Sequence, residues 1–180
     1  MFILIINLID NPVILNNDTH KNEKGDAMTN SSLKPGLSYE FSFKILENKT
    51  VPHLYPESLE FSMMPKILAT GFMVGLFEWA CIQAINPYID WPDEQTVGTA
   101  VNLTHEAATP PGLTVTVKVK LEGIEGRKLT FSIIAHDGID KISEGTHERF
   151  LIIASKFNKK VQAKALRVAS KFAVISPNPL

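Results

Sequence analysis

The sequence predicts an α+β domain in which an antiparallel sheet wraps around one long helix. Two observations predict this arrangement. Residues 66–85 have the length of a helix and are apolar almost all the way round, which is typical of a helix buried on most sides. Four segments rich in β-branched residues follow, divided by short turns, and this pattern predicts consecutive antiparallel strands. Because a sheet must cover one face, we expect the apolar helix to pack against it.

Each strand is predicted from its own pattern. Residues 37–46 and 113–121 alternate apolar and polar side chains, the two-residue period of a half-buried strand. The other strands are expected at residues 95–105, 128–135 and 141–153, with Gly- and Pro-containing turns between them.

An antiparallel sheet wrapped around one central helix is the hotdog fold. The helix is expected to stop at Asn86-Pro87, because proline cannot continue a helix. A single layer of this kind leaves a sheet edge and one helix flank open. We therefore expect a homodimer.

The length of 180 residues suits one domain. We expect residues 33–158 to form this domain and residues 1–32 to be an N-terminal extension outside the fold. Residues 159–180 are expected to be a C-terminal helix or tail, because weak helical character begins near Lys156.

The first residues allow two interpretations. The apolar residues 2–9 are far fewer than the roughly 20 of a spanning helix, and they lack the basic region and cleavage site of a signal peptide. Residues 1–27 are then either outside the fold, with Met28 near a true start, or they contribute an extra edge strand at residues 2–9.

Composition argues against several classes of function. A net charge of −1 gives no basic excess for nucleic acid, and no segment is typical of a membrane protein. The single cysteine, Cys81, forms no internal disulfide and favours a cytoplasmic location. The five histidines and this cysteine show no zinc-binding spacing, so we expect no metal.

Glu78 is an unusual residue for its position, because it lies within GLFEWACI in the apolar helix. An ionised carboxylate in such surroundings is costly unless it is paired. It is either a functional group, such as a general base, a nucleophile or a water-positioning residue, or a carboxylate at a wet dimer interface or on a solvated stripe of the helix. Cys81, one turn later, is expected to be a small core residue.

Two further polar residues flank predicted elements. Thr70 lies near the start of the helix and is either its N-cap or a hydroxyl aimed at a substrate carbonyl. Eight residues of helix rise about 12 Å, so Thr70 and Glu78 act on one atom only if Thr70 precedes the first regular turn or the substrate spans the gap. His105 ends a strand and is either a proton shuttle or a turn-capping histidine. These residues by themselves select no reaction.

Six stretches between residues 53 and 158 carry a family resemblance. They are HLYPES (53–58), ATGFMVGLFEWACI (69–82), VGTAVNLTHEAATPPGLTVTV (97–117), EGRKLTFSIIAHDG (125–138), GTHERF (145–150) and KFN (156–158). In this order and spacing the chain resembles the fluoroacetyl-CoA thioesterase family. The resemblance implies a hotdog enzyme that hydrolyses a small acyl-CoA to the free acid and CoA.

The resemblance also implies roles for particular residues. It places the catalytic group on Thr70, Glu78 and His105. It implies that the backbone N–H of Gly98 faces the acyl group and that Arg149 lines the acyl pocket. No cofactor is implied, because CoA is part of the substrate.

One departure from the family concerns the aromatic lid before the catalytic threonine. Phe61 matches one lid phenylalanine, whereas the second falls on Met64. Methionine is flexible and adapts to varied shapes. The departure therefore bears on selectivity for the fluoroacetyl group rather than on hydrolysis.

Two other functions compete with this one. A hotdog enoyl-CoA hydratase or dehydratase would need an Asp/His pair, against which the Thr, Glu and His trio argues. A non-catalytic acyl-CoA-binding module would be indicated by the loss of one of these three residues, and all three are present.

Overall fold

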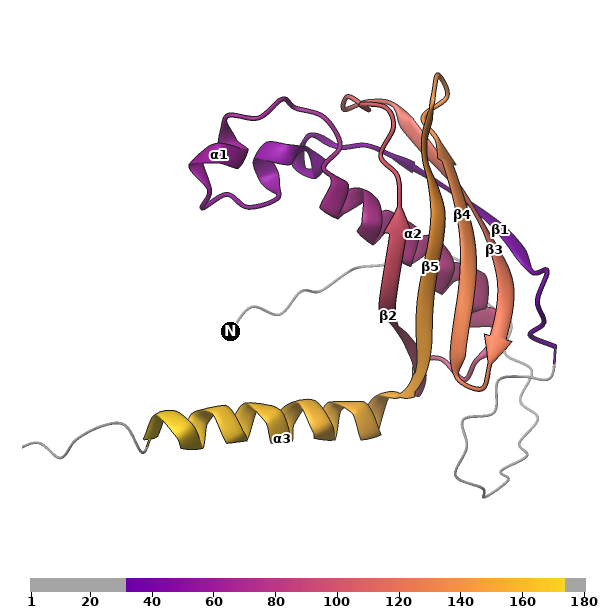
Figure 1. The fold of residues 1–180 in the computed structure, drawn as a ribbon, viewed down its shortest axis with the longest axis vertical. Helices are drawn as coiled ribbons and strands as arrows, with labels where there is room; N and C mark the ends of the chain where they lie inside the picture. Colours follow the sequence, from indigo (N-terminus) through magenta and orange to yellow (C-terminus); the bar gives the residue numbers. More distant parts are fainter. Residues whose placement is uncertain (1–31, 174–180) are drawn as a thin grey trace, which may run out of the picture.

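A computed structural model describes residues 32–173, with side chains as far as residue 168. Five strands form one antiparallel sheet in the order β1-β3-β4-β5-β2. The strands are β1 (Ser38–Lys44), β2 (Glu94–Leu103), β3 (Thr114–Glu125), β4 (Lys128–His136) and β5 (Lys141–Ile153). The sheet curves around the long helix α2 (Thr70–Ile85) (Figure 1). The predicted architecture of one sheet around one helix is thereby confirmed.

The strands form where apolar side chains alternate. In β3, Val115, Val117, Val119 and Leu121 are buried, while the residues between them are partly or fully exposed. β4 follows the same period, so the two strands present one apolar face to α2. The pairing of Val117 with Ala135 fixes this register, because a slip by one residue would turn every apolar side chain outward.

Helix α2 is covered on one side only. Its buried residues are Met73, Leu76, Phe77, Ala80, Cys81, Ala84 and Ile85. On the opposite flank Gly71, Gly75 and Trp79 are exposed, and the Glu78 side chain keeps 39% of its accessible surface. The prediction of a helix buried on most sides is therefore wrong for a single chain, because the sheet wraps only one face.

The helix also starts later than expected. It begins at Thr70 rather than at Lys66, and Ala69 is its N-cap residue. The residues before it are held in an extended connection, in which Leu68 N–H donates to the Thr109 carbonyl and pairs with Thr50. Lys66 instead forms an exposed ion pair with Glu47.

A small lobe precedes α2. It contains the short helices η1 (Glu47–Lys49), η2 (Val51–His53) and α1 (Leu59–Ser62). Gly71 lies against this lobe, because a Cβ at that position would come within 3.0 Å of a Leu54 methyl carbon. The lobe stands apart from the sheet beside the first turn of α2 (Figure 1).

The C-terminal part of the described chain is helical. The short helix η3 (Asn86–Tyr88) ends α2, and α3 (Ala154–Ala173) follows β5 directly and extends away from the sheet (Figure 1). Of the helix or tail expected at residues 159–180, the described part is helical as far as Ala173, and this helix starts at Ala154. Within residues 32–173 no helix is long and apolar enough to cross a membrane. The expectations for residues 1–27, for Met28 and for an edge strand at residues 2–9 lie outside the described residues.

Candidate active site

Thr70 and His105 form the first part of the site. The Thr70 hydroxyl and His105 Nδ1 are 2.9 Å apart and share a hydrogen bond across 35 positions of sequence. Thr70 is the first residue of α2, with its hydroxyl paired to the imidazole rather than capping the helix. His105 lies two residues beyond the end of β2, not within the strand as expected. The pair is partly open to solvent.

Glu78 belongs to a second group of residues. Its Oε1 lies 3.7 Å from Arg149 NH1 and 3.8 Å from His147 Nε2. Both β5 side chains are almost completely buried, at 2% and 1% exposure, whereas Glu78 is partly exposed. The carboxylate therefore lies at the border between solvent and a buried cationic group.

The two contacts of Glu78 differ in character. Burial lowers the pKa of His147, and the hydrogen bond to the Ala100 carbonyl does not reverse this shift. The imidazole is consequently neutral at neutral pH, and its contact with Glu78 is not an ion pair. Burial also lowers the pKa of Arg149, with Glu78 opposing, but a guanidinium stays charged in proteins. Arg149 is thus the cation that faces Glu78.

Gly98 makes room for the Glu78 carboxylate. A Cβ added at Gly98 would overlap Glu78 Oε1 and lie 3.1 Å from His147 Cε1. The β2–β5 register shifts between Gly98 and Ala100, and such bulges often re-aim side chains beside active sites. The sequence expectation placed Gly98 at the site, and the structure brings it into contact with Glu78.

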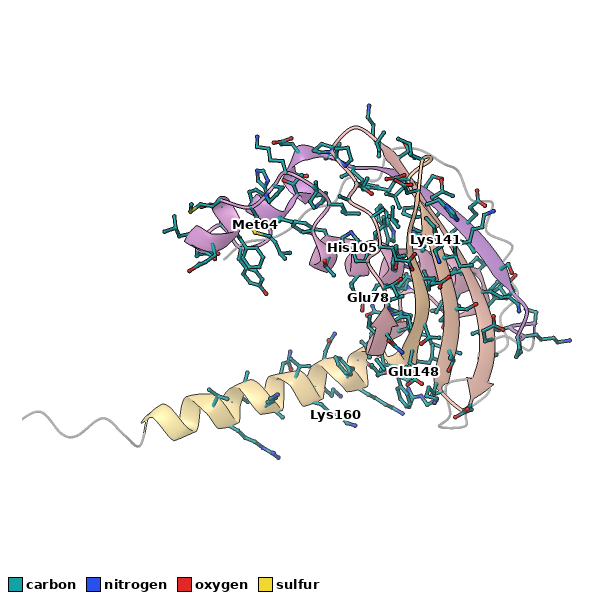
Figure 2. The ribbon with its side chains drawn as sticks, turned by 45° about the horizontal axis from the view of Figure 1, so that its top comes forward. Met64, Glu78, His105, Lys141, Glu148 and Lys160 are labelled. Carbon is teal, nitrogen blue, oxygen red and sulfur yellow. The ribbon has the colours of Figure 1, made fainter. Side chains whose placement is uncertain are left out.

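The two groups are carried by one helix. Thr70, Val74 and Glu78 follow one another at spacings of four, so they lie along the same side of α2. The rise between Thr70 and Glu78 is about 12 Å, because Thr70 lies inside the helix. Of the two possibilities left open by the sequence, the structure favours a substrate that spans the gap. Figure 2 shows His105 and Glu78 between the α1 lobe and the sheet.

The predicted lid residues lie in the lobe. Phe61 stacks on Tyr55, with ring centroids 5.6 Å apart, and Ser58 caps the short helix α1 that carries Phe61. Met64 is 51% exposed and lies in the lobe away from the sheet (Figure 2). The structure therefore places Met64 at the surface of the single chain.

Asp137 and Thr109, from the motifs AHDG and AATPPG, are joined by a hydrogen bond. Asp137 of AHDG accepts hydrogen bonds from the buried Thr109 hydroxyl of AATPPG at 3.0 Å and from the N–H groups of Ile139 and Asp140. Burial raises the pKa of Asp137, but these hydrogen bonds lower it more, so it lies below its ordinary value. The carboxylate thus ties the two turns together.

Cys81 lies one turn after Glu78 in α2 and is completely buried in the core. Burial raises the pKa of its thiol to about 12, although Arg149 acts in the opposite direction. A thiol of this kind is neutral and unreactive. The structural position agrees with the expectation of a small core residue.

An apolar groove runs between α2 and the end of β1, and neither Thr70 nor Glu78 lines it. It has a volume of about 260 Å³. A Cβ at Gly75 would meet nothing within 4 Å, so a ligand can approach the backbone closely there, whereas Leu54 packs against Gly71. The groove is lined by Phe43, Ile45, Lys49, Leu68, Gly71, Phe72, Gly75, Leu76 and Trp79.

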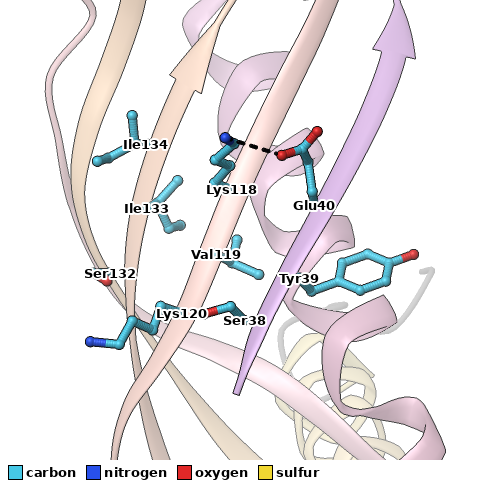
Figure 3. Close-up of a pocket in the computed structure, with 9 residues that line it drawn as sticks. All are labelled: Ser38, Tyr39, Glu40, Lys118, Val119, Lys120, Ser132, Ile133 and Ile134. Atoms are coloured by element: carbon cyan, nitrogen blue, oxygen red, sulfur yellow. Dashed lines mark ion pairs between the residues drawn. The ribbon is translucent and has the colours of Figure 1, made fainter. Parts of the chain in front are cut away.

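A larger hollow, of about 430 Å³, lies over β1, β3 and β4 (Figure 3). The exposed ion pair between Lys118 and Glu40 crosses it at 3.3 Å. None of the predicted site residues lines it. None of them lines the groove beside α2 either, but that groove runs along the helix that carries Thr70 and Glu78, which favours it as the candidate for substrate. Among residues 32–173 no group of three or more His, Cys, Asp and Glu side chains is arranged to hold a metal ion.

Sequence reasoning assigned no part in the site to His147, Thr96 or Ala100. His147 lies two positions before Arg149 in a strand, so both side chains face the same side of the sheet. This alternation could have indicated from the sequence that His147 lies beside Arg149. The hydrogen bonds to Thr96 and Ala100 depend on the pairing of β2 with β5, which the local pattern does not reveal.

Comparison with known proteins identifies the family. The family model for fluoroacetyl-CoA-specific thioesterase matches residues 50–155. A fluoroacetyl-CoA thioesterase from Streptantibioticus cattleyicolor is 53% identical over 132 residues, which cover 73% of this chain and 94% of the relative. The chain belongs to this family.

Solved structures agree with this membership. A structure of a fluoroacetyl-CoA thioesterase is 52% identical and superposes with a TM-score of 0.72, covering 74% of this chain and 98% of the other. A thioesterase superfamily member from Thermus thermophilus is 23% identical with a TM-score of 0.64, over 80% of this chain and 98% of the other. The similarity to the Thermus thermophilus protein supports the fold alone. The hotdog fold is confirmed, and the chain is a thioester hydrolase.

Proposed function

We propose that this enzyme hydrolyses a short or small acyl-CoA to the free acid and CoA, with Thr70, Glu78 and His105 as its catalytic group. The observation that carries the proposal is the hydrogen bond between the Thr70 hydroxyl and His105 Nδ1, 2.9 Å long, on the same side of α2 as Glu78. A solved relative of 52% identity holds acetyl-CoA, which supports the substrate class.

The proposed reaction breaks the C–S bond of the thioester and forms a C–O bond. Glu78 either activates water or attacks the carbonyl carbon directly, and in the second case water then cleaves the acyl–enzyme bond and releases the acid. His105 delivers a proton to the departing thiolate, while Thr70 donates a hydrogen bond to the substrate or serves as an alternative nucleophile. The N–H of Gly98 is proposed to bind the carbonyl or a polar group on the acyl chain. Water is the only co-substrate, so no cofactor is needed.

The electrostatics of the site suit this division of roles. Arg149, buried and charged, faces Glu78 at 3.7 Å. The guanidinium thus offsets the charge of the carboxylate, and a carboxylate is the form of glutamate that acts as base or nucleophile. We propose that Arg149 contributes to the acyl pocket from beneath Glu78 rather than by direct contact with the open groove.

The groove between α2 and β1 is proposed to take part of the substrate. Gly75 leaves room in it, and its walls include the aromatic rings of Phe43, Phe72 and Trp79. The rise of about 12 Å between Thr70 and Glu78 is longer than a thioester group, so the acyl-CoA as a whole is proposed to span it. Phe61 and Met64 of the lobe are proposed to cover the acyl end.

A homodimer is part of the proposal. The edge strand β2 exposes Val101 to 45%, and α2 exposes Trp79 to 41% on its uncovered flank. The open edge and the apolar helix flank lie toward opposite edges of the sheet, since Trp79 packs against Phe41 and Phe43 of β1, and association of two copies would cover such exposed surfaces. Sedimentation equilibrium measures this directly, and a monomer at micromolar concentration would contradict it. The lone, buried Cys81 supports a cytoplasmic location.

A thiol-release assay tests the function. The panel contains acetyl-, fluoroacetyl-, short branched and aryl-CoA esters together with a crotonyl-type thioester. Release of CoA from at least one ester is expected. Hydration of the crotonyl ester without free thiol would instead indicate a hydratase, and binding without release would indicate a non-catalytic module.

Glu78→Ala tests the catalytic group. We expect the variant to lose turnover without unfolding, because the carboxylate lies at the border of the core and is partly exposed. Glu125→Ala is the matched control, because Glu125 is the last residue of β3 and its side chain is 76% exposed. Near-native kcat in Glu78→Ala on every ester that the enzyme hydrolyses would refute the assignment.

A further inference from the structure

His147 is a buried imidazole to which the proposed reaction gives no role. It alternates with Arg149 along β5, and both side chains face α2 at 1% and 2% exposure. Burying two such polar groups is costly unless their hydrogen bonds are satisfied. Their partners therefore show what the pair does.

The hydrogen bonds of His147 select one form of its ring. Nδ1 lies 2.9 Å from the Ala100 carbonyl oxygen, and because a carbonyl only accepts, Nδ1 carries the hydrogen. Nε2 lies 3.0 Å from Arg149 NH1, and because a guanidinium only donates, Nε2 presents its lone pair. The neutral Nδ1–H form satisfies both contacts. A protonated ring would set a second N–H against the guanidinium.

Arg149 is held at three points. Its Nε donates to the Thr96 hydroxyl at 2.9 Å and its NH2 donates to the Thr96 carbonyl at 2.8 Å. The third contact is NH1 to His147, and NH1 is also the atom that lies 3.7 Å from Glu78 Oε1. The two Thr96 contacts fix one side of the guanidinium, and His147 fixes the side that faces the carboxylate.

We propose that His147 is a positioning residue of this active site. In its neutral Nδ1–H form it accepts a hydrogen bond from Arg149 and holds the guanidinium against Glu78, so that it acts on the reaction through Arg149. The inference rests on the proposed catalytic role of Glu78. Loss of the acceptor leaves a buried guanidinium N–H unpaired and frees Arg149 to turn away from the carboxylate.

Two substitutions separate positioning from packing. In His147→Gln the amide oxygen can still accept from Arg149, whereas His147→Leu fills similar space without an acceptor. We expect His147→Leu to lower kcat about 10- to 100-fold with KM largely unchanged, and His147→Gln to recover most of kcat. His136→Leu, at an exposed position of β4, is the control and should match the parent enzyme.

Nuclear magnetic resonance shows which ring nitrogen of His147 carries the hydrogen, independently of any activity measurement. Long-range proton–nitrogen spectra of enzyme labelled at histidine distinguish protonated from unprotonated ring nitrogens, and the His147 signals are those missing in His147→Gln. We expect a protonated Nδ1 and an unprotonated Nε2 at neutral pH. This measurement stays decisive if the leucine variant does not fold.

Three results would overturn the proposal. They are a protonated Nε2 at neutral pH, parent-like kcat in His147→Leu, and equal losses of kcat in the leucine and glutamine variants. The failure of the proposed function is a different result, namely no thiol release by the parent enzyme from any ester, and it leaves the spectroscopic outcome for His147 readable.

Discussion

Gly98→Ala is expected to disable the enzyme while preserving its fold. The added Cβ would overlap Glu78 Oε1 and lie 3.1 Å from His147 Cε1. The backbone of Gly98 does not adopt a positive φ, so alanine brings no conformational strain there. The flexible Glu78 side chain is the part that yields, and it must withdraw by about 1 Å, a displacement that typically lowers turnover about 100-fold.

The assay compares kcat for thiol release with the urea midpoint of unfolding. Gly123→Ala is the matched control, because a Cβ there meets no atom within 4 Å and the backbone is likewise outside the left-handed region. We expect kcat to fall about 100-fold in Gly98→Ala and to stay unchanged in Gly123→Ala, with similar stability in both. Undiminished kcat in a folded Gly98→Ala enzyme would refute the placement of Glu78 against β2.

Three further predictions follow from other parts of the molecule. Asp137→Ala should lower the free energy of unfolding by about 3 kcal/mol without changing kcat, as urea denaturation and thiol release would measure. The folded-state pKa of Asp137 lies below 3.8. The stabilisation by its carboxylate is therefore complete above pH 3.8 and is lost as the pH falls through the folded-state pKa. Stabilisation that persists in stronger acid would contradict this. Cys81, with a pKa of about 12, should react with thiol reagents only in denaturant, and rapid labelling of the native enzyme would disprove its burial. Met64→Phe should raise the ratio of kcat/KM for fluoroacetyl-CoA over acetyl-CoA by up to about tenfold, whereas an unchanged ratio would show that this lid position does not select the acyl group.

The local pattern predicted the sheet strands well. The strand expected at residues 141–153 has those bounds in the structure, and the one expected at residues 128–135 extends by one residue. The alternation of apolar and polar residues along a strand indicates which of its faces is buried. The end of α2 at Ile85, before Asn86-Pro87, was predicted correctly. Its start was not, because residues 66–69 continue the helical pattern while Leu68 hydrogen-bonds to a distant turn instead.

The site was predicted only as separate residues. Thr70 and Glu78 lie on one helix, so their spacing was calculable from the sequence. The pairing of Thr70 with His105 was not, because it depends on how the segment after β2 passes the start of α2. The exposure of Glu78 was left open between a buried group and a solvated stripe of the helix, and the structure shows it partly exposed, since the pattern of a helix does not reveal how far a sheet will wrap around it.

The sequence by itself determined the class of fold, the order of the elements and the residue types available for hydrolysis, because periodicity and composition are local properties of the chain. Tertiary structure alone decided which of those residues meet. The pairing of β2 with β5 buries Arg149 and His147 beneath Glu78, and the register shift after Gly98 brings the Ala100 carbonyl to the imidazole. These contacts join residues about 50 positions apart, so they are fixed by strand pairing rather than by any neighbouring stretch of sequence.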